Sequence, residues 1–77
     1  MKKIIIKNEK STIQLDEVKE TDYIVAKKQD KIYGVIYCDD DNDWCFCKSG
    51  KNFDCNKNLI DLLDYEYIRD CEFYVMD

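Results

Sequence analysis

Histidine is absent from this 77-residue chain, and glycine occurs only at Gly34 and Gly50. Without an imidazole, a serine or cysteine nucleophile lacks its usual general base. Two isolated glycines cannot form the glycine-rich loop that cradles phosphate groups. Carboxylate pairs arise by chance on an acidic surface, so they do not identify an acid–base site. These absences predict a protein that is not an enzyme and that uses no cofactor.

Long apolar runs are also missing. The run at 4–6 consists of isoleucines and ends at Lys7. A signal peptide needs an apolar stretch of at least about seven residues, and a membrane span needs about twenty. We therefore expect a cytoplasmic protein that does not bind membranes. Alanine is rare, and residues with AT-rich codons (Lys, Ile, Asn, Asp, Tyr) are common, which is typical of a low-GC bacterium or its phage.

Cysteine, by contrast, is abundant, with five residues: Cys38, Cys45, Cys47, Cys55 and Cys71. The odd count and the lack of an export signal favour reduced thiols, mostly buried as small apolar side chains. A structural zinc-thiolate site is the alternative, but the spacing lacks the paired C-x2-C knuckle that usually encloses zinc.

Asp39, Asp41 and Asp43 alternate as in a calcium loop, yet Trp44 and Gly50 occupy the positions that need glycine and glutamate. We expect no bound metal.

Strand and helix patterns predict one α+β domain over residues 1–77. Runs of β-branched and aromatic residues favour strands, and polar clusters mark turns. The expected strands are 2–7, 12–15, 23–27, 32–38, 44–48 and 72–76. Leucines at helical spacing predict a helix over 58–70, one helical turn is expected at 16–22, and 49–58 is expected to be a loop. The result is a mostly antiparallel sheet, built from a two-stranded hairpin, a three-stranded meander and a closing strand, with one helix packed on one face.

The turn between 38 and 44 decides which side chains share a face of the sheet. An even loop places Cys38 opposite Cys45 and Tyr37 opposite Phe46. One face is then expected to collect Tyr33, Val35, Tyr37, Trp44 and Phe46. Because one helix cannot cover both faces, either an aromatic face is left for a partner or other segments fold over it. We expect the aromatic face to be only partly covered within the monomer. A slip of one residue would exchange the two sets.

Charge is divided unevenly along the chain. Residues 1–31 carry eight lysines against six acidic residues, whereas 32–77 carry four basic against eleven acidic residues. The net charge of −5 repels nucleic acid and anionic membranes but attracts basic surfaces. The partner is therefore expected to be another protein with a basic surface. The residues predicted to bind it are Asp39, Asp40, Asp41, Asp43, Tyr33, Tyr37 and Trp44.

These features predict a small acidic protein-interaction module. The most specific form of this hypothesis is a phage-type inhibitor or regulator. Such a protein imitates nucleic acid and binds to a partner protein that handles nucleic acid. Two alternatives stay open at this point. One is the structural zinc-thiolate module, and the other is a β domain that forms homodimers or larger oligomers through its aromatic face.

Overall fold

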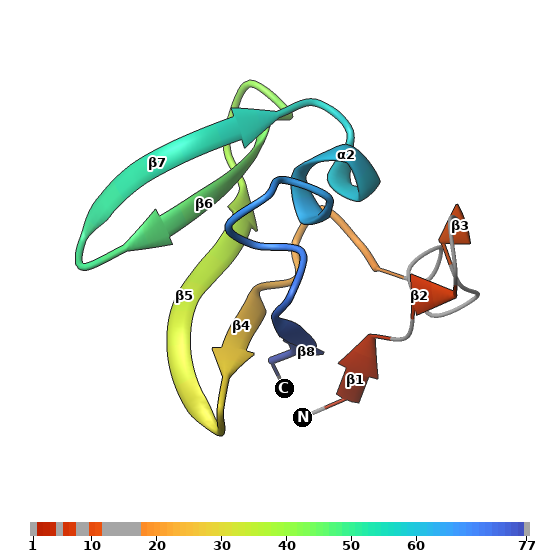
Figure 1. The fold of residues 1–77 in the computed structure, drawn as a ribbon. Helices are drawn as coiled ribbons and strands as arrows, with labels where there is room; N and C mark the ends of the chain where they lie inside the picture. The colour runs from red at the N-terminus through yellow and green to blue at the C-terminus, as the bar shows by residue number, and fades with distance from the viewer. Residues whose placement is uncertain (1, 5, 8–9, 12–17, 77) are drawn as a thin grey trace.

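The computed structural model describes residues 2–4, 6–7, 10–11 and 18–76. They form an α+β fold, as predicted, with the strands antiparallel in every pair (Figure 1). The strands are β1 (Lys2–Ile4), β2 (Ile6–Lys7), β3 (Lys10–Ser11), β4 (Ile24–Lys28), β5 (Lys31–Cys38), β6 (Trp44–Lys48), β7 (Lys51–Asn56) and β8 (Glu72–Val75). The main sheet has six strands in the order β1-β8-β4-β5-β6-β7, and β2 pairs with β3.

The strands β4, β5 and β6 confirm the predicted meander. Residues 29–30 form the first turn, with positive φ angles of 52° at Gln29 and 64° at Asp30. Two such residues in succession match the twist of the flanking strands, which is why this turn closes a two-residue hairpin. The predicted closing strand is also confirmed as β8, which pairs with both β4 and β1.

The prediction of a loop over 49–58 is wrong for most of this range, because the strand β7 occupies Lys51–Asn56. Ser49 and Gly50 form another two-residue turn with positive φ angles of 55° and 78°. This turn folds β7 back onto β6 and makes it an edge strand of the sheet. The strand was hidden because its sequence, KNFDCN, is dominated by residues of low strand propensity.

The helix is shorter than predicted. It is α2 (Leu59–Leu63), and hydrogen-bonded turns replace the expected helix over residues 64–70. Tyr65 and Tyr67 both reach side chains of β7 from this segment. Residues two apart on an α-helix differ by about 200° around its axis, so their side chains lie on nearly opposite sides of the helix. Both hydroxyls can therefore meet the same strand only because the helix ends first.

The N-terminal segment differs from the expected hairpin. The predicted strand 2–7 contributes β1, which pairs with β8, and β2, which pairs with β3. The predicted strand at 12–15 lies outside the described residues. Of the predicted helical turn at 16–22, the described residues form a hydrogen-bonded turn in which the Asp22 N–H donates to the Lys19 carbonyl over 2.9 Å.

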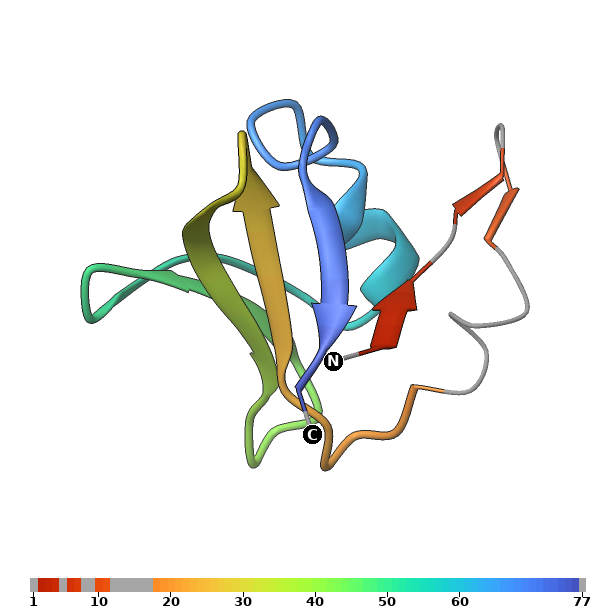
Figure 2. The same cartoon turned by 90° about the horizontal axis from the view of Figure 1, so that it is seen from below.

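The core lies between the sheet and the layer formed by α2 and the 64–71 segment. Figure 2 shows β5, β4, β8 and β1 side by side, with α2 on their far side. The helix buries all three of its leucines, Leu59, Leu62 and Leu63. They pack in one cluster with Ile4, Ile24, Ala26, Ile36, Trp44, Phe46, Ile68, Cys71 and Phe73. The prediction of one helix packed on one face is confirmed.

The register of the β5–β6 hairpin is shifted by one residue from the prediction. Cys38 lies opposite Trp44, and Ile36 lies opposite Phe46. The cause is Asn42, whose φ of 63° places it in the left-handed region and closes a three-residue loop. As a result, Trp44 and Phe46 belong to the buried face, and only 7% of Trp44 is exposed. The expectation that Trp44 lies on an open aromatic face is wrong.

Candidate interaction surfaces

The turn between β5 and β6 is held together by its own first residue. The Asp39 N–H donates to the Asp43 carbonyl over 2.8 Å, and the Asn42 N–H donates to the Asp39 carbonyl over 3.0 Å. Asp39 Oδ1 also accepts the N–H of Asp41 at 2.9 Å and that of Asp43 at 3.0 Å. Asp39 therefore uses its carboxylate to fix the loop, as aspartate does in many turns.

The remaining carboxylates of the turn have different surroundings. Asp43 Oδ1 lies 3.2 Å from the Lys57 ammonium, which comes from the segment that joins β7 to α2. Asp40 and Asp41 are exposed and have no ion pair within the described part of the chain. We call Asp40 and Asp41, as held by Asp39, the acidic turn. It lies at one end of β5, opposite the 29–30 turn (Figure 1).

A second set of observations shows that negative charge gathers near this end of the sheet. Burial raises the pKa of the Cys38 thiol above its ordinary value, and three nearby carboxylates raise it further: Glu20, Asp39 and Asp43. Glu20 belongs to the segment before β4 and is exposed. Acidic residues from separate parts of the chain therefore contribute to one negative region.

Two β-bulges build an aromatic cluster on the buried face of the sheet. Ala26 pairs with Gly34 and Lys27 with Ile32, so Tyr33 is the extra residue of β5. The same irregularity in β7 makes Phe53 an extra residue. A bulge re-aims the side chain that it inserts. The rings that meet around Phe46 are those of Tyr33, Phe53 and Tyr67, with centroids 5.6, 6.4 and 5.7 Å from that of Phe46.

Gly34 makes this cluster possible. A Cβ atom at Gly34 would lie 2.4 Å from Phe46 Cζ and 2.9 Å from the Cys47 carbonyl oxygen. Real Cβ atoms do not approach other atoms so closely. Glycine thus allows the Phe46 ring to lie directly against β5 and to reach Tyr33.

Two lysines border the cluster. The ammonium groups of Lys28 and Lys48 each lie 4.2 Å from the centroid of the Tyr33 ring. Each is placed to interact with the π-electrons of the ring. Phe53 adjoins the same cluster and is 56% exposed. We call Lys28, Tyr33, Lys48 and Phe53 the lysine–aromatic surface.

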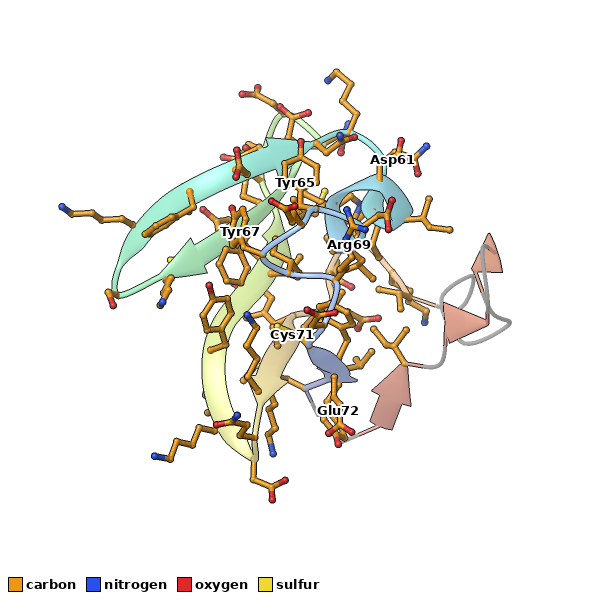
Figure 3. The ribbon with its side chains drawn as sticks, viewed as in Figure 1. Asp61, Tyr65, Tyr67, Arg69, Cys71 and Glu72 are labelled. Atoms are coloured by element: carbon orange, nitrogen blue, oxygen red, sulfur yellow. A yellow bond between two sulfur atoms is a disulfide. The ribbon has the colours of Figure 1, made fainter. Side chains whose placement is uncertain are left out.

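Tyrosines from the 64–71 segment hold β7 against the rest of the fold. Figure 3 shows Tyr65 and Tyr67 on this segment, beside β6 and β7. The Tyr67 hydroxyl donates a short hydrogen bond to Asp54 Oδ2, and Asn56 Nδ2 donates to the Tyr65 hydroxyl over 3.4 Å. Burial, followed by the bond to Asp54, raises the pKa of Tyr67 well above its ordinary value.

No family model matches this chain, and no curated protein or solved structure matches it either. Its function must therefore be inferred from the arrangement of its own residues.

The structure separates the residues that the sequence predicted to bind a partner. The exposed aspartates lie at the acidic turn, whereas Tyr33 belongs to the lysine–aromatic surface at the other end of β5. Tyr37 lies on the opposite face of the sheet, where its hydroxyl donates to Asn52 Oδ1 over 3.1 Å. Trp44 is buried in the core. Its burial removes the reason for placing it in a binding surface.

Sequence reasoning missed Lys28, Lys48 and Phe53. The two lysines are twenty positions apart, and only the sheet brings both to one ring. Phe53 carried a signal, because it is the one large apolar residue in an otherwise polar stretch. Its neighbours Ser49 and Gly50 form a turn that a hairpin interpretation could have used.

The cysteines also depart from the expectation of free thiols. Cys45 and Cys55 face each other across β6 and β7, with Cα atoms 4.1 Å apart, and form a disulfide. Cys38, Cys47 and Cys71 are free.

Within the described ranges, no group of three or more Cys, Asp or Glu residues could hold a metal ion. None of the described helices is long and apolar enough to cross a membrane.

Proposed function

We propose that this protein is a non-enzymatic interaction module that binds a basic surface of another protein through its acidic turn. The observation that carries the proposal is the role of Asp39. Its carboxylate accepts two backbone N–H groups of the turn, so the loop is fixed before any partner arrives. Preorganisation of this kind lowers the entropic cost of binding.

The charges of the turn support the same conclusion. Asp40 and Asp41 are exposed at the tip of a hairpin whose two strands hold the backbone. The only described ion pair of the turn involves Asp43, so Asp40 and Asp41 have no cationic partner among the described residues. Exposed charges of this type mainly accelerate association and select for complementary surfaces.

The sharpest form of the proposal is an inhibitor or regulator of phage type, acting on a protein that handles nucleic acid. Such a partner carries a basic groove for phosphate groups. Carboxylates at the tip of a narrow hairpin have the sign and the reach to enter that groove. The protein would not bind nucleic acid itself, since its net charge is −5.

An oligolysine peptide provides a defined basic probe for the acidic turn. The variant Asp40→Asn/Asp41→Asn removes two charges, and asparagine is well tolerated in turns. We expect this variant to bind the peptide several-fold more weakly than the wild type at low salt. The difference should shrink as salt rises, because exposed charges are screened beyond about 8–10 Å.

The matched control is Asp64→Asn/Asp70→Asn, which removes two exposed charges from the 64–71 segment. It changes the net charge by the same amount but leaves the turn intact. If both variants lose affinity equally, binding follows net charge, and the acidic turn is not a specific site.

A further inference from the structure

The two ends of β5 carry surfaces of opposite charge. The lysine–aromatic surface surrounds Tyr33 near the start of the strand, and the acidic turn begins at Asp39, just after its end. A strand advances about 3.3 Å per residue, so the two surfaces lie roughly 20 Å apart. That is much farther than a lysine side chain extends. The acidic turn therefore cannot neutralise these lysines within one molecule.

The lysines lack a carboxylate of their own. The ammonium groups of Lys28 and Lys48 each lie 4.2 Å from the centroid of the Tyr33 ring, so their positive charges are at most twice that distance apart. Within the described part of the chain, neither forms an ion pair, and the one described ion pair involves Lys57. Two like charges held near each other are relieved when an anion binds between or beside them. The lysine–aromatic surface is therefore suited to a ligand that carries carboxylates.

The acidic turn offers the matching number of charges. The Asp39 carboxylate already accepts two backbone N–H groups, and the Asp43 carboxylate already forms an ion pair with Lys57. This leaves Asp40 and Asp41, which are exposed, for two lysines that lack a carboxylate.

One exposed apolar side chain adds to the complementarity of the lysine–aromatic surface. Phe53 is 56% exposed, although it adjoins a well-packed cluster. Exposed apolar residues beside a charged patch are a common feature of protein interfaces, where they supply buried area while the charges set orientation.

We propose that the lysine–aromatic surface of one copy of this chain binds the acidic turn of a second copy. The contact is head to tail, because the two surfaces that meet are different and lie at opposite ends of β5. Such a contact leaves one acidic turn and one lysine–aromatic surface free at the ends, so copies can continue to add. This inference rests on the proposed function, because it names the chain itself as one bearer of the basic surface that the turn recognises.

Two neutral variants test the pairing of these surfaces. Lys28→Gln/Lys48→Gln removes the positive charges of the lysine–aromatic surface but keeps the acidic turn. Asp40→Asn/Asp41→Asn removes the negative charges of the acidic turn but keeps the lysine–aromatic surface. In sedimentation velocity over a range of concentrations, we expect the wild type to self-associate and each variant alone to remain a monomer. An equimolar mixture should stop at a one-to-one dimer, because each variant retains one working surface.

A charge-swapped chain provides a rescue that a merely structural effect would not produce. It carries Lys28→Glu, Lys48→Glu, Asp40→Lys and Asp41→Lys together, so both surfaces change sign. We expect it to self-associate again. Circular dichroism and urea unfolding identify any variant that fails to fold. For such a variant, the single substitutions Lys48→Gln and Asp41→Asn replace the pair and should weaken self-association in the same direction.

The outcomes separate this inference from the proposed function. If the wild type is a monomer at millimolar concentration but binds oligolysine through Asp40 and Asp41, the second-copy inference is wrong and the proposed function stands. If it self-associates equally well in both neutral variants, the pairing of these two surfaces is wrong. If it neither self-associates nor binds oligolysine, both proposals fail.

Discussion

Asp39 Oδ2 lies 3.5 Å from the sulfur of Cys45. The other oxygen of Asp39 accepts two backbone N–H groups of the acidic turn. One carboxylate thus stands between the turn that carries the exposed aspartates and the disulfide that joins β6 to β7. The Asp39 side chain therefore contacts both the turn and the end of the disulfide that belongs to β6.

Substitution of Asp39 should therefore cost more stability than substitution of its neighbours. Asp39→Ala leaves two N–H groups of the turn without their acceptor, and we expect the free energy of unfolding to fall by about 1–2 kcal/mol. Asp40→Ala is the control, because Asp40 is exposed and should change stability by less than about 0.5 kcal/mol. Urea unfolding measures both values. Equal effects for the two variants would show that Asp39 does not hold the turn.

The disulfide between Cys45 and Cys55 gives a second prediction. It closes a loop with a sequence separation of 10 residues and ties the edge strand β7 to the sheet. Reduction should lower the free energy of unfolding by about 2–3 kcal/mol, since short disulfide loops contribute on this scale. Cys55 is exposed and Cys45 is buried, so a reductant should attack the sulfur of Cys55 first.

The measurement is thermal unfolding with and without a phosphine reductant, with intact-mass analysis to confirm the thiol state. Cys55→Ser is the control, because it should already have the lower stability and show no further response to the reductant. A reduced wild type as stable as the oxidised protein would mean that β7 is held by its side-chain contacts alone.

Comparison of sequence and structure shows which features the local pattern could predict. The strands β4 and β6 are rich in β-branched, aromatic and cysteine residues, and their positions were predicted within one residue. The register between β5 and β6 was not, because it depends on one backbone angle at Asn42. That residue could have indicated the odd loop, since asparagine adopts positive φ more readily than most residues.

The lysine–aromatic surface could not be predicted from alternation. Tyr33 and Phe53 share a cluster with Phe46 because each is the extra residue of a bulge. A bulge depends on how two strands pair, so it cannot be predicted from the sequence of either strand alone. The same limit applies to the disulfide, because Cys55 lies on β7, whose polar sequence resembles a loop.

Gly34 supplies the third prediction. Gly34→Ala places a methyl group where the Phe46 ring and the Cys47 carbonyl now lie. Because Phe46 is fully buried, the ring has little room to move, and we expect a loss of about 1–3 kcal/mol, as is usual when a packed core is overfilled. Near-ultraviolet circular dichroism should report the disturbed aromatic cluster. Gly34→Ala combined with Phe46→Leu is the control, because the smaller side chain should recover part of the lost cooperativity of unfolding.

The last prediction concerns Tyr67 at alkaline pH. Its hydroxyl donates to Asp54, and burial followed by this bond raises its pKa above that of a tyrosine in the unfolded chain. A group whose pKa is higher in the folded state stabilises the protein fully below the unfolded pKa of about 10. That contribution is lost as pH rises above the unfolded value toward the folded one. We therefore expect the free energy of unfolding to decrease with pH above about 10 and to decrease less steeply in Tyr67→Phe.

Ultraviolet titration of the phenolate resolves the assignment. The folded wild type should show one tyrosine that ionises well after the ordinary ones, and that delayed step should be missing in Tyr67→Phe. Tyr65→Phe is the matched control, since Tyr65 lies on the same segment but only accepts a hydrogen bond, from Asn56. If Tyr65→Phe removed the delayed step and Tyr67→Phe did not, the bond between Tyr67 and Asp54 would not be its cause. If neither variant removed it, the raised pKa would belong to another tyrosine, and the alkaline loss of stability could not be ascribed to the contact between the 64–71 segment and β7.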